Sequence, residues 1–367
     1  MKQAYLADEI FTGTNSLSGK LLLTENNRIV GISPAGDLPS GYSLHTFPDC
    51  MIVPAFIDLQ IYGGNGKLFS HSLDTESLEA TQAYCAAGGC SHFMITMATN
   101  SMENFFKGIE TVRTYFASGK KGLLGLHLEG PWISPAKKGA HIESFIKKPT
   151  WAEVTAIIEK GKGIVRMITL APELCDDTIV KVLLDNGILV SAGHSNAGYA
   201  RAQEVFKLGV PAATHLFNAM SPLQGREPGM VGAIYDDPRV MSSIICDGVH
   251  VDFASVRISK KIMGDRLFFI TDAVTEIREG NYIHIFQGDR YTLPDGTLSG
   301  SCMTMMSTFK NALTKSGISL EEALKMCSLY PANLLNDPNL GRIETGKPAN
   351  FIILHKKTLD LVASVFY

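Results

Sequence analysis

The feature that most constrains the fold is an alternation, from about residue 50 onward, of short apolar runs with amphipathic stretches. Apolar runs of about four to eight residues are typical of strands buried on both faces. The amphipathic stretches between them have helical spacing, and several end in glycine, a frequent helix stop. We predict eight strands, at residues 52–60, 92–97, 122–128, 164–170, 188–193, 211–215, 241–246 and 266–271.

Strands that alternate with helices form parallel sheets, which places the chain in the α/β class. Eight such units predict a (β/α)8 TIM-like barrel, while a doubly wound open sheet is the alternative that the spacing leaves open. The chain before the barrel is β-rich, because "GKLLLTENNRIVGIS" has the pattern of a hairpin. After the eighth strand, residues 302–336 have a helical pattern, and "GRIETGKPANFIILHKK" returns to turns and strand.

Charge bears on the partners of the chain, and cysteine content and apolar segments bear on its compartment. Thirty-three basic and thirty-six acidic residues give a net charge of −3 without long runs of one sign, so we expect no nucleic-acid or membrane partner. The seven cysteines form no C-x-x-C pair, which is typical of reduced thiols. The first residues lack the apolar core of a signal peptide, and no apolar stretch reaches transmembrane length, so we expect a cytoplasmic protein.

Polar side chains with acid, base or ligand chemistry follow most of the predicted strands. They are Gln60, Glu129, Glu173, His194, His215, Asp247 and Asp272. In a (β/α)8 barrel the carboxyl ends of the strands carry the active site. The recurrence of these groups at one rim therefore predicts a catalytic centre there.

Three of these residues have the composition of a metal site. His194 and His215 end neighbouring strands, and together with Glu129 they form a His2Glu set with room for water, as in catalytic zinc sites. Each histidine taken alone has a simpler interpretation as a hydrogen-bonded structural residue. Asp272, at the end of "FFITDAV", could cap the next helix, or it could act as a general base beside the metal.

The loops after strands three, six and seven supply candidate substrate contacts. They are Ala140 and His141 in "KKGAH", Asn218, Ala219 and Arg226 in "NAMSPLQGREPG", and His250 in "CDGVHVD". Arg226 lies in a loop rich in glycine and proline, where its planar guanidinium could bind an oxyanion. A solvated surface arginine is the alternative.

Seven motifs in order carry a family resemblance: "HLEGPWISPAKKGAH", "SAGHSNA", "THLFNAM", "GREPG", "CDGVHVD", "ITDAV" and "GTLSGS". With them the chain resembles the N-acetylglucosamine-6-phosphate deacetylase family of the amidohydrolase superfamily, from about residue 50 to the end. The resemblance implies a metallohydrolase barrel over residues 51–337. It also implies a small β-sandwich domain built from residues 1–50 and 338–367.

The resemblance also implies an activity and roles for the site residues. The substrate would be a phosphorylated N-acetyl amino sugar, hydrolysed to acetate and the free amine by a homodimeric enzyme. One divalent ion per subunit would be held by Glu129, His194 and His215. Zn²⁺ suits these ligands best, and Fe²⁺, Mn²⁺ and Co²⁺ also suit them. Asp272 would be base and then acid, and His250 would hold the substrate carbonyl. Sugar and phosphate would contact Ala140, His141, Asn218, Ala219, Arg226 and the backbone of Leu298, Ser299 and Gly300.

The strand "AFIDLQIYGG" departs from the superfamily pattern Asp-x-His-x-His. Gln60 and Tyr62 stand at the two histidine positions, and neither is a good ligand for a zinc-like ion. We therefore expect a vestigial second-metal position and one metal in total.

Three other functions remain as alternatives. The galacto epimer of the sugar phosphate would need the same chemistry. A cyclic amidase is disfavoured, because such enzymes usually carry the histidine pair and a bridging lysine. A barrel that binds a sugar phosphate without catalysis would explain the missing pair, but the retained Glu129, His194, His215 and Asp272 argue against it.

Overall fold

A computed structural model describes residues 1–367, and all eight predicted barrel strands are confirmed. They form one parallel sheet in the order β15-β14-β13-β12-β11-β10-β9-β6. Their bounds are β6 Phe56–Ile61, β9 Cys90–Ala98, β10 Leu123–Glu129, β11 Val165–Leu170, β12 Leu189–Ala192, β13 Ala212–Ala213, β14 Met241–Ile245 and β15 Leu267–Ile270.

The sheet closes where the end of β6 meets the residues after β15. The Asp272 amide donates to the Gln60 carbonyl at 3.0 Å, and the Tyr62 amide donates to the Ala273 carbonyl at 2.9 Å. These bonds make a barrel rather than an open sheet. They also bring the first and last strand ends together at the rim where the polar residues gather.

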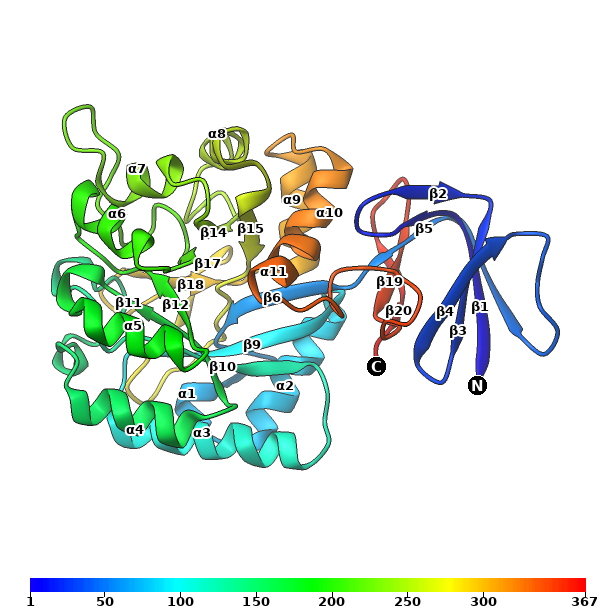
Figure 1. Ribbon diagram of the computed structural model, residues 1–367. Coiled ribbons are helices and arrows are strands. Elements are labelled where there is room, and N and C mark those ends of the chain that lie inside the picture. Colours follow the sequence, from blue (N-terminus) through cyan, green and yellow to red (C-terminus); the bar gives the residue numbers. More distant parts are fainter.

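Helices follow the strands, as the amphipathic stretches predict, and surround the sheet (Figure 1). Their bounds are α1 Phe69–Ser72, α2 Thr75–Ala87, α3 Met102–Ala117, α4 Trp151–Gly161, α5 Asp177–Asp185, α6 Tyr199–Lys207, α7 Gly229–Asp236, α8 Phe253–Met263, α9 Met305–Thr314, α10 Leu320–Cys327 and α11 Leu329–Leu334. Several have side-chain caps; Thr150 and Glu153 form a capping box at α4. No helix combines the length and apolar character that a membrane span needs.

Both chain ends contribute to a second, seven-stranded sheet beside the barrel (Figure 1). Its strands are β1 Lys2–Phe11, β2 Ser16–Ser18, β3 Lys20–Glu25, β4 Arg28–Pro34, β5 Ser43–Pro54, β19 Phe351–His355 and β20 Leu361–Val365. The predicted hairpin is β3–β4, turned by Asn26 and Asn27 at positive φ of 46° and 69°. β5 runs across the predicted boundary at residue 50, and the division into domains stays a prediction.

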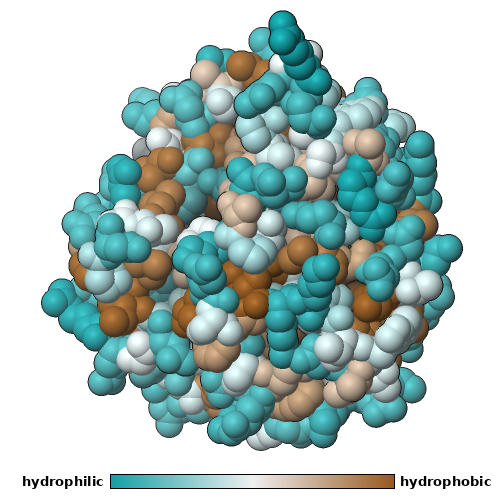
Figure 2. All heavy atoms as spheres, turned by 90° about the vertical axis from the view of Figure 1, so that its left-hand side faces the viewer, coloured by the Kyte–Doolittle hydropathy of each residue, from teal (hydrophilic) through white to brown (hydrophobic).

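The loops after the barrel strands lie on the side away from the seven-stranded sheet, the left-hand side of Figure 1. Figure 2 shows this face, which is largely hydrophilic, with apolar groups in its recessed parts. Two short antiparallel sheets lie among these loops: β7 Gly63–Gly64 with β8 Lys67–Leu68, and β16 Ile285–Phe286, β17 Arg290–Thr292 and β18 Leu298–Ser301. The second brings residues far beyond the last barrel strand to the site, since the Val274 amide donates to the Ser301 carbonyl at 3.1 Å.

Candidate active site

A cavity of 280 Å³ opens at the carboxyl ends of the barrel strands, and most predicted site residues line it. Those residues are Tyr62, Glu129, Ala140, His141, His194, His215, Asn218, Ala219, His250, Asp272, Leu298, Ser299 and Gly300. Gln60 is fully buried behind the wall, where it contacts Glu129 and Asp272. The strand ends therefore converge on one small polar chamber.

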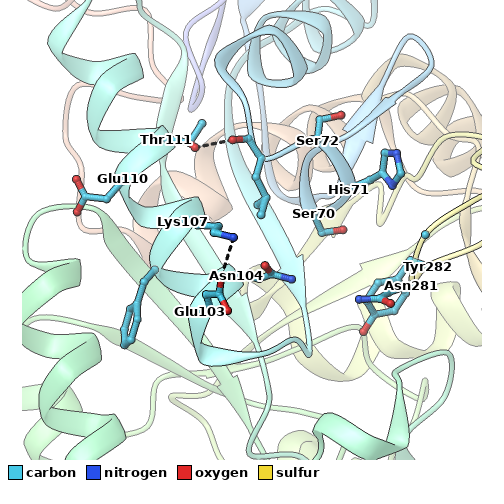
Figure 3. Close-up of a pocket in the computed structure, with 13 residues that line it drawn as sticks. Ser70, His71, Ser72, Glu103, Asn104, Lys107, Glu110, Thr111, Asn281 and Tyr282 are labelled. Carbon is cyan, nitrogen blue, oxygen red and sulfur yellow. Dashed lines mark hydrogen bonds and ion pairs between the residues drawn. The ribbon is translucent and has the colours of Figure 1, made fainter.

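A larger cavity of 840 Å³ lies beside it, between α1, α3 and the segment around Asn281 (Figure 3). None of the predicted site residues lines it. Lys107 in its wall pairs with Glu103 at 2.8 Å within the exposed face of α3. The predicted site residues therefore lie at the smaller chamber.

Glu129, His194 and His215 meet as the metal prediction requires. Glu129 Oε1 lies 3.1 Å from His215 Nε2 and 3.3 Å from His194 Nε2, and the two nitrogens are 3.1 Å apart. Ligands of a tetrahedral cation at about 2.0–2.1 Å are about 3.3 Å from one another. The carboxylate oxygen and the two imidazole nitrogens are thus spaced to share one divalent ion.

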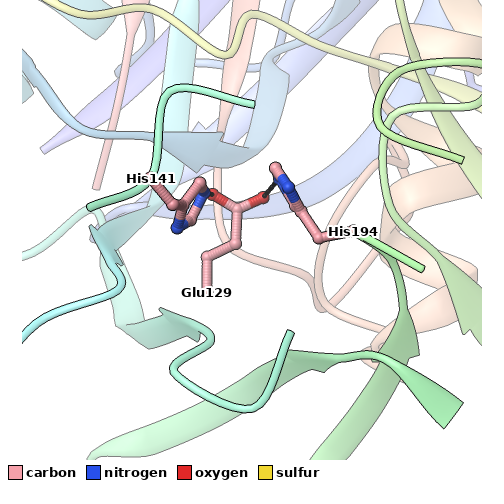
Figure 4. Close-up of side chains that lie close together, drawn as sticks. All are labelled: Glu129, His141 and His194. Atoms are coloured by element: carbon pink, nitrogen blue, oxygen red, sulfur yellow. Dashed lines mark hydrogen bonds and ion pairs between the residues drawn. The ribbon is translucent and has the colours of Figure 1, made fainter. Parts of the chain in front are cut away.

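His141 also contacts Glu129, so a second triad of Glu129, His141 and His194 must be weighed (Figure 4). The Thr99 amide donates to His141 Nδ1 at 3.2 Å, and burial lowers the pKa of His141 to about 4. The ring is therefore neutral with its proton on Nε2, which donates to Glu129 Oε2 at 3.2 Å. A nitrogen that carries a proton has no lone pair for a metal.

His194 has the opposite tautomer. Its Nδ1 donates to the Lys137 carbonyl at 2.8 Å, which leaves the Nε2 lone pair directed at Glu129 Oε1. His215 Nδ1 is buried without a partner, and its ring packs edge-on against His194 with centroids 4.8 Å apart. The hydrogen bonds thus favour Glu129, His194 and His215 as the ligand set, with His141 as a donor to Glu129.

The Glu129 carboxyl is fully buried. Burial alone would raise its pKa, but the surrounding imidazoles of His194, His141 and His215 hold the pKa well below the usual value. Glu129 is therefore ionised at neutral pH, as a ligand for a divalent cation must be.

Asp272 faces the same chamber from the end of β15. Gln60 Nε2 donates to Asp272 Oδ1 at 2.8 Å and to Glu129 Oε1 at 3.0 Å, and so bridges the two carboxylates. Burial raises the pKa of Asp272, opposed by His215 and reinforced by the charge of Glu129. A raised pKa suits a carboxylate that must take up and return a proton.

Three of these side chains are presented by strained backbone. His194, His215 and Asp272 have φ of 46°, 40° and 55°, in the left-handed region, which costs roughly 1–3 kcal/mol each. Backbone bonds hold these conformations: the Ser134 amide donates to the His194 carbonyl at 2.8 Å, and the Ser301 amide to the Asp272 carbonyl at 3.0 Å. Strain of this kind is concentrated at functional sites.

His250 is held by Asp247 rather than by the other site residues. Its Nδ1 lies 2.5 Å from Asp247 Oδ2, while backbone amides of Val249 and His250 donate to Asp247 Oδ1 at 2.8 Å each. Burial would raise the pKa of Asp247, but the bond from His250 outweighs it and the pKa is lowered. His250 Nε2 is left for contact with a molecule in the chamber.

Two predicted residues lie elsewhere. Arg226 is exposed and does not line the chamber of its own chain. Glu173 braces the loop after β12 instead, since Ser195 Oγ and the Asn196 amide donate to its carboxylate at 2.7 Å and 2.6 Å. Tyr282 and His284 line the chamber although no sequence pattern indicated them.

Comparison with known proteins identifies the family. The Amidohydrolase family model matches residues 51–367, most of the chain. The chain belongs to the amidohydrolase family.

Within this family, the chain is 36% identical to N-acetylglucosamine-6-phosphate deacetylase of Haemophilus influenzae, over 96% of this chain and 95% of that protein. It is 33% identical to N-acetylgalactosamine-6-phosphate deacetylase of Shewanella sp., over 83% of this chain and 79% of that one. The crystal structure of N-acetylglucosamine-6-phosphate deacetylase from Pasteurella multocida superposes with a TM-score of 0.94 at 33% identity, covering 100% of this chain and 98% of that one.

Proposed function

We propose that this amidohydrolase removes the acetyl group of N-acetyl-D-glucosamine 6-phosphate, giving D-glucosamine 6-phosphate and acetate. The observation that carries the proposal is the convergence of Glu129, His194 and His215 within 3.3 Å of one another beside Asp272. The similarity to the Haemophilus deacetylase, over nearly the whole of both chains, supports the substrate class.

The donor set fits one divalent cation, held by Glu129 Oε1, His194 Nε2 and His215 Nε2. Such a cation supplies Lewis acidity, which makes water a better nucleophile and polarises the acetyl carbonyl. Zn²⁺ is the first choice for two imidazoles and a carboxylate, and Fe²⁺, Mn²⁺ and Co²⁺ remain candidates.

The chain's own residues move the proton. Asp272 takes a proton from the attacking water, whose oxygen bonds to the carbonyl carbon. It then gives that proton to the amide nitrogen as the carbon–nitrogen bond breaks, so that the amine leaves neutral; the acetic acid that remains loses its second water-derived proton to solvent and becomes acetate. His250, oriented by Asp247, positions the acetyl group through Nε2. The backbone at Leu298, Ser299 and Gly300, with Ala140, His141, Asn218 and Ala219, forms the wall against which the sugar phosphate lies.

The test is release of acetate from N-acetylglucosamine 6-phosphate by purified protein. We expect turnover that a chelator abolishes and added divalent cation restores, with a higher kcat/KM on the gluco than on the galacto epimer. A preference for the galacto epimer would support the activity of the Shewanella relative instead. Tight binding of either sugar without acetate release would support a non-catalytic barrel.

We also propose a homodimer in which Arg226 binds the phosphate of the neighbouring subunit's substrate. Arg226 is exposed outside its own chamber, and next to it the exposed side chains of Leu223 and Ile262 border a shallow apolar hollow. An apolar patch beside a free arginine suits a contact between copies.

Seven unpaired cysteines fit a cytoplasmic location.

Arg226→Ala is expected to raise KM for the phosphosugar about 10- to 100-fold with little change in kcat, because a charged hydrogen bond to phosphate would be lost. Arg113→Ala, on the exposed face of α3, is the control. Mixed dimers of Arg226→Ala with Asp272→Asn should recover a low KM, since one of their two sites then has both groups. No recovery in dimers shown to be mixed would mean that Arg226 does not act across the interface.

A further inference from the structure

Tyr62 is the site residue that the proposed reaction leaves without a role. It directly follows β6, at the predicted vestigial second-metal position, and its hydroxyl contacts Glu129 Oε2. Gln60 Nε2 lies 3.0 Å from the same hydroxyl. The pair thus contacts both oxygens of the Glu129 carboxylate, Tyr62 at Oε2 and Gln60 at Oε1.

The direction of these hydrogen bonds follows from the partners. Gln60 faces two carboxylates, which accept only, so its amide nitrogen must be the atom beside Glu129 and Asp272. The two hydrogens of that nitrogen serve the two carboxylates, and the Tyr62 hydroxyl oxygen lies 3.0 Å from it. Because the Glu129 carboxylate only accepts, the phenolic hydrogen is directed at Oε2, and Tyr62 is the donor.

Hydrogen bonds make the two oxygens of the Glu129 carboxylate inequivalent. Oε2 accepts from Tyr62 and from His141 Nε2, while Oε1 accepts from Gln60 Nε2 with one lone pair and faces His194 and His215 with the other. A carboxylate fixed in this way offers one oxygen to a cation and keeps the other engaged. Without the Tyr62 donor, the carboxylate could rotate about its last bond and lose the 3.1–3.3 Å spacing to the two imidazoles.

The position of the Tyr62 hydroxyl is itself fixed. The Tyr62 amide donates to the Ala273 carbonyl at 2.9 Å, and its carbonyl accepts from the Phe69 amide at 3.0 Å. Its ring packs against the buried cluster of Leu68, Ala98, Val274 and Tyr282. The phenol is a rigid support rather than a mobile side chain that happens to reach Glu129.

We propose that Tyr62 is a positioning residue, whose hydroxyl holds Glu129 so that Oε1 alone faces the catalytic cation. The inference rests on the proposed function, because it concerns the same metal site. Partners that orient a ligand typically contribute about 10- to 100-fold to metal affinity or activity. Tyr62 and Gln60 thus take over, by hydrogen bonding, the second-metal position that the superfamily pattern fills with histidines.

The test compares Tyr62→Phe with wild type and with Tyr115→Phe. Tyr115 is a matched control, because it is also a buried tyrosine whose hydroxyl donates, to Gln82 Oε1 at 2.6 Å, but it lies on α3 away from the site. Binding of Zn²⁺ or Co²⁺ to metal-free protein is measured by titration calorimetry, alongside kcat, KM and thermal unfolding.

We expect Tyr62→Phe to weaken cation binding about 10- to 100-fold at unchanged stoichiometry. Its kcat should fall, its KM should stay within about twofold of wild type, and its thermal unfolding should match that of Tyr115→Phe. Unchanged cation affinity overturns the proposal, whether KM rises, which would make Tyr62 a substrate contact, or stays the same. Equal weakening in Tyr115→Phe also overturns it. Cation binding by wild type without acetate release would refute the proposed function and leave the Tyr62 comparison intact.

Discussion

Replacing Asp272 with asparagine is expected to lower kcat about 10²- to 10⁴-fold while the protein still binds one divalent cation, because general acid–base catalysis contributes a factor of this size. Asparagine keeps the shape of the side chain, and its oxygen can still accept the hydrogen bond from Gln60 Nε2. It cannot accept a proton from water or return one to the leaving nitrogen. Initial rates of acetate release measure the loss of kcat, and the bound metal content shows whether the cation is retained.

The matched control is Asp237→Asn. Asp237 is also buried and paired, with Arg239 at 2.7 Å, but it lies in the link between α7 and β14 and outside the chamber. We expect this variant to keep wild-type kcat even if it is less stable. Full activity in Asp272→Asn would remove the base from the mechanism, and loss of its metal would make Asp272 a ligand instead.

The barrel could be predicted from sequence because its determinants are local. A strand buried on both faces must be apolar along its length, and a covering helix must be amphipathic, so both periods are visible in the chain itself. The predicted strand at 211–215 shrinks to Ala212–Ala213, since His215 takes a left-handed backbone and leaves the sheet. The local sequence pattern identifies the strand, but the backbone conformation of the site residue decides where the strand ends.

The residues proposed to be catalytic were predictable for a different reason. Parallel strands in a barrel deliver their carboxyl ends to one rim, so His194, His215, Glu129 and Asp272 had to meet once the strands were known. Their tautomers could not be foreseen, because Thr99 and Lys137, which fix His141 and His194, come from loops. The positions of the strand ends predict which candidate ligands lie close together, and contacts from the loops decide which imidazole nitrogen can bind a cation.

Tyr282 and His284 show where sequence reasoning ends. They lie after the last barrel strand, in a segment without helical or strand period, and they reach the chamber because the β16–β18 sheet folds back over the rim. Leu298, Ser299 and Gly300, in the same sheet, were expected only through the family resemblance. Arg226 was expected to contact substrate, but it is exposed outside the chamber of its own chain, which is why we place that role in the proposed dimer.

The tautomers assigned to His141 and His194 predict different metal binding by His215→Ala and His141→Ala. Wild type is expected to bind about one divalent ion per chain. His215→Ala should lose that ion and all measurable acetate release, because Glu129 and His194 then offer two ligands where a catalytic site needs three. His141→Ala should keep the ion with an affinity lowered about 10- to 100-fold, since it removes a donor to Glu129 and no ligand.

Metal analysis after dialysis, followed by calorimetric titration of each metal-free variant, separates the two. If His141→Ala loses the ion and His215→Ala keeps it, the ligand set is Glu129, His141 and His194, and the proton placed on His141 Nε2 is wrong. Two ions in wild type would mean that Gln60 or Tyr62 yields its hydrogen bonds to a second cation. With one ion, the neutral Gln60 amide at that corner bridges Glu129 and Asp272 and keeps these two buried carboxylates side by side.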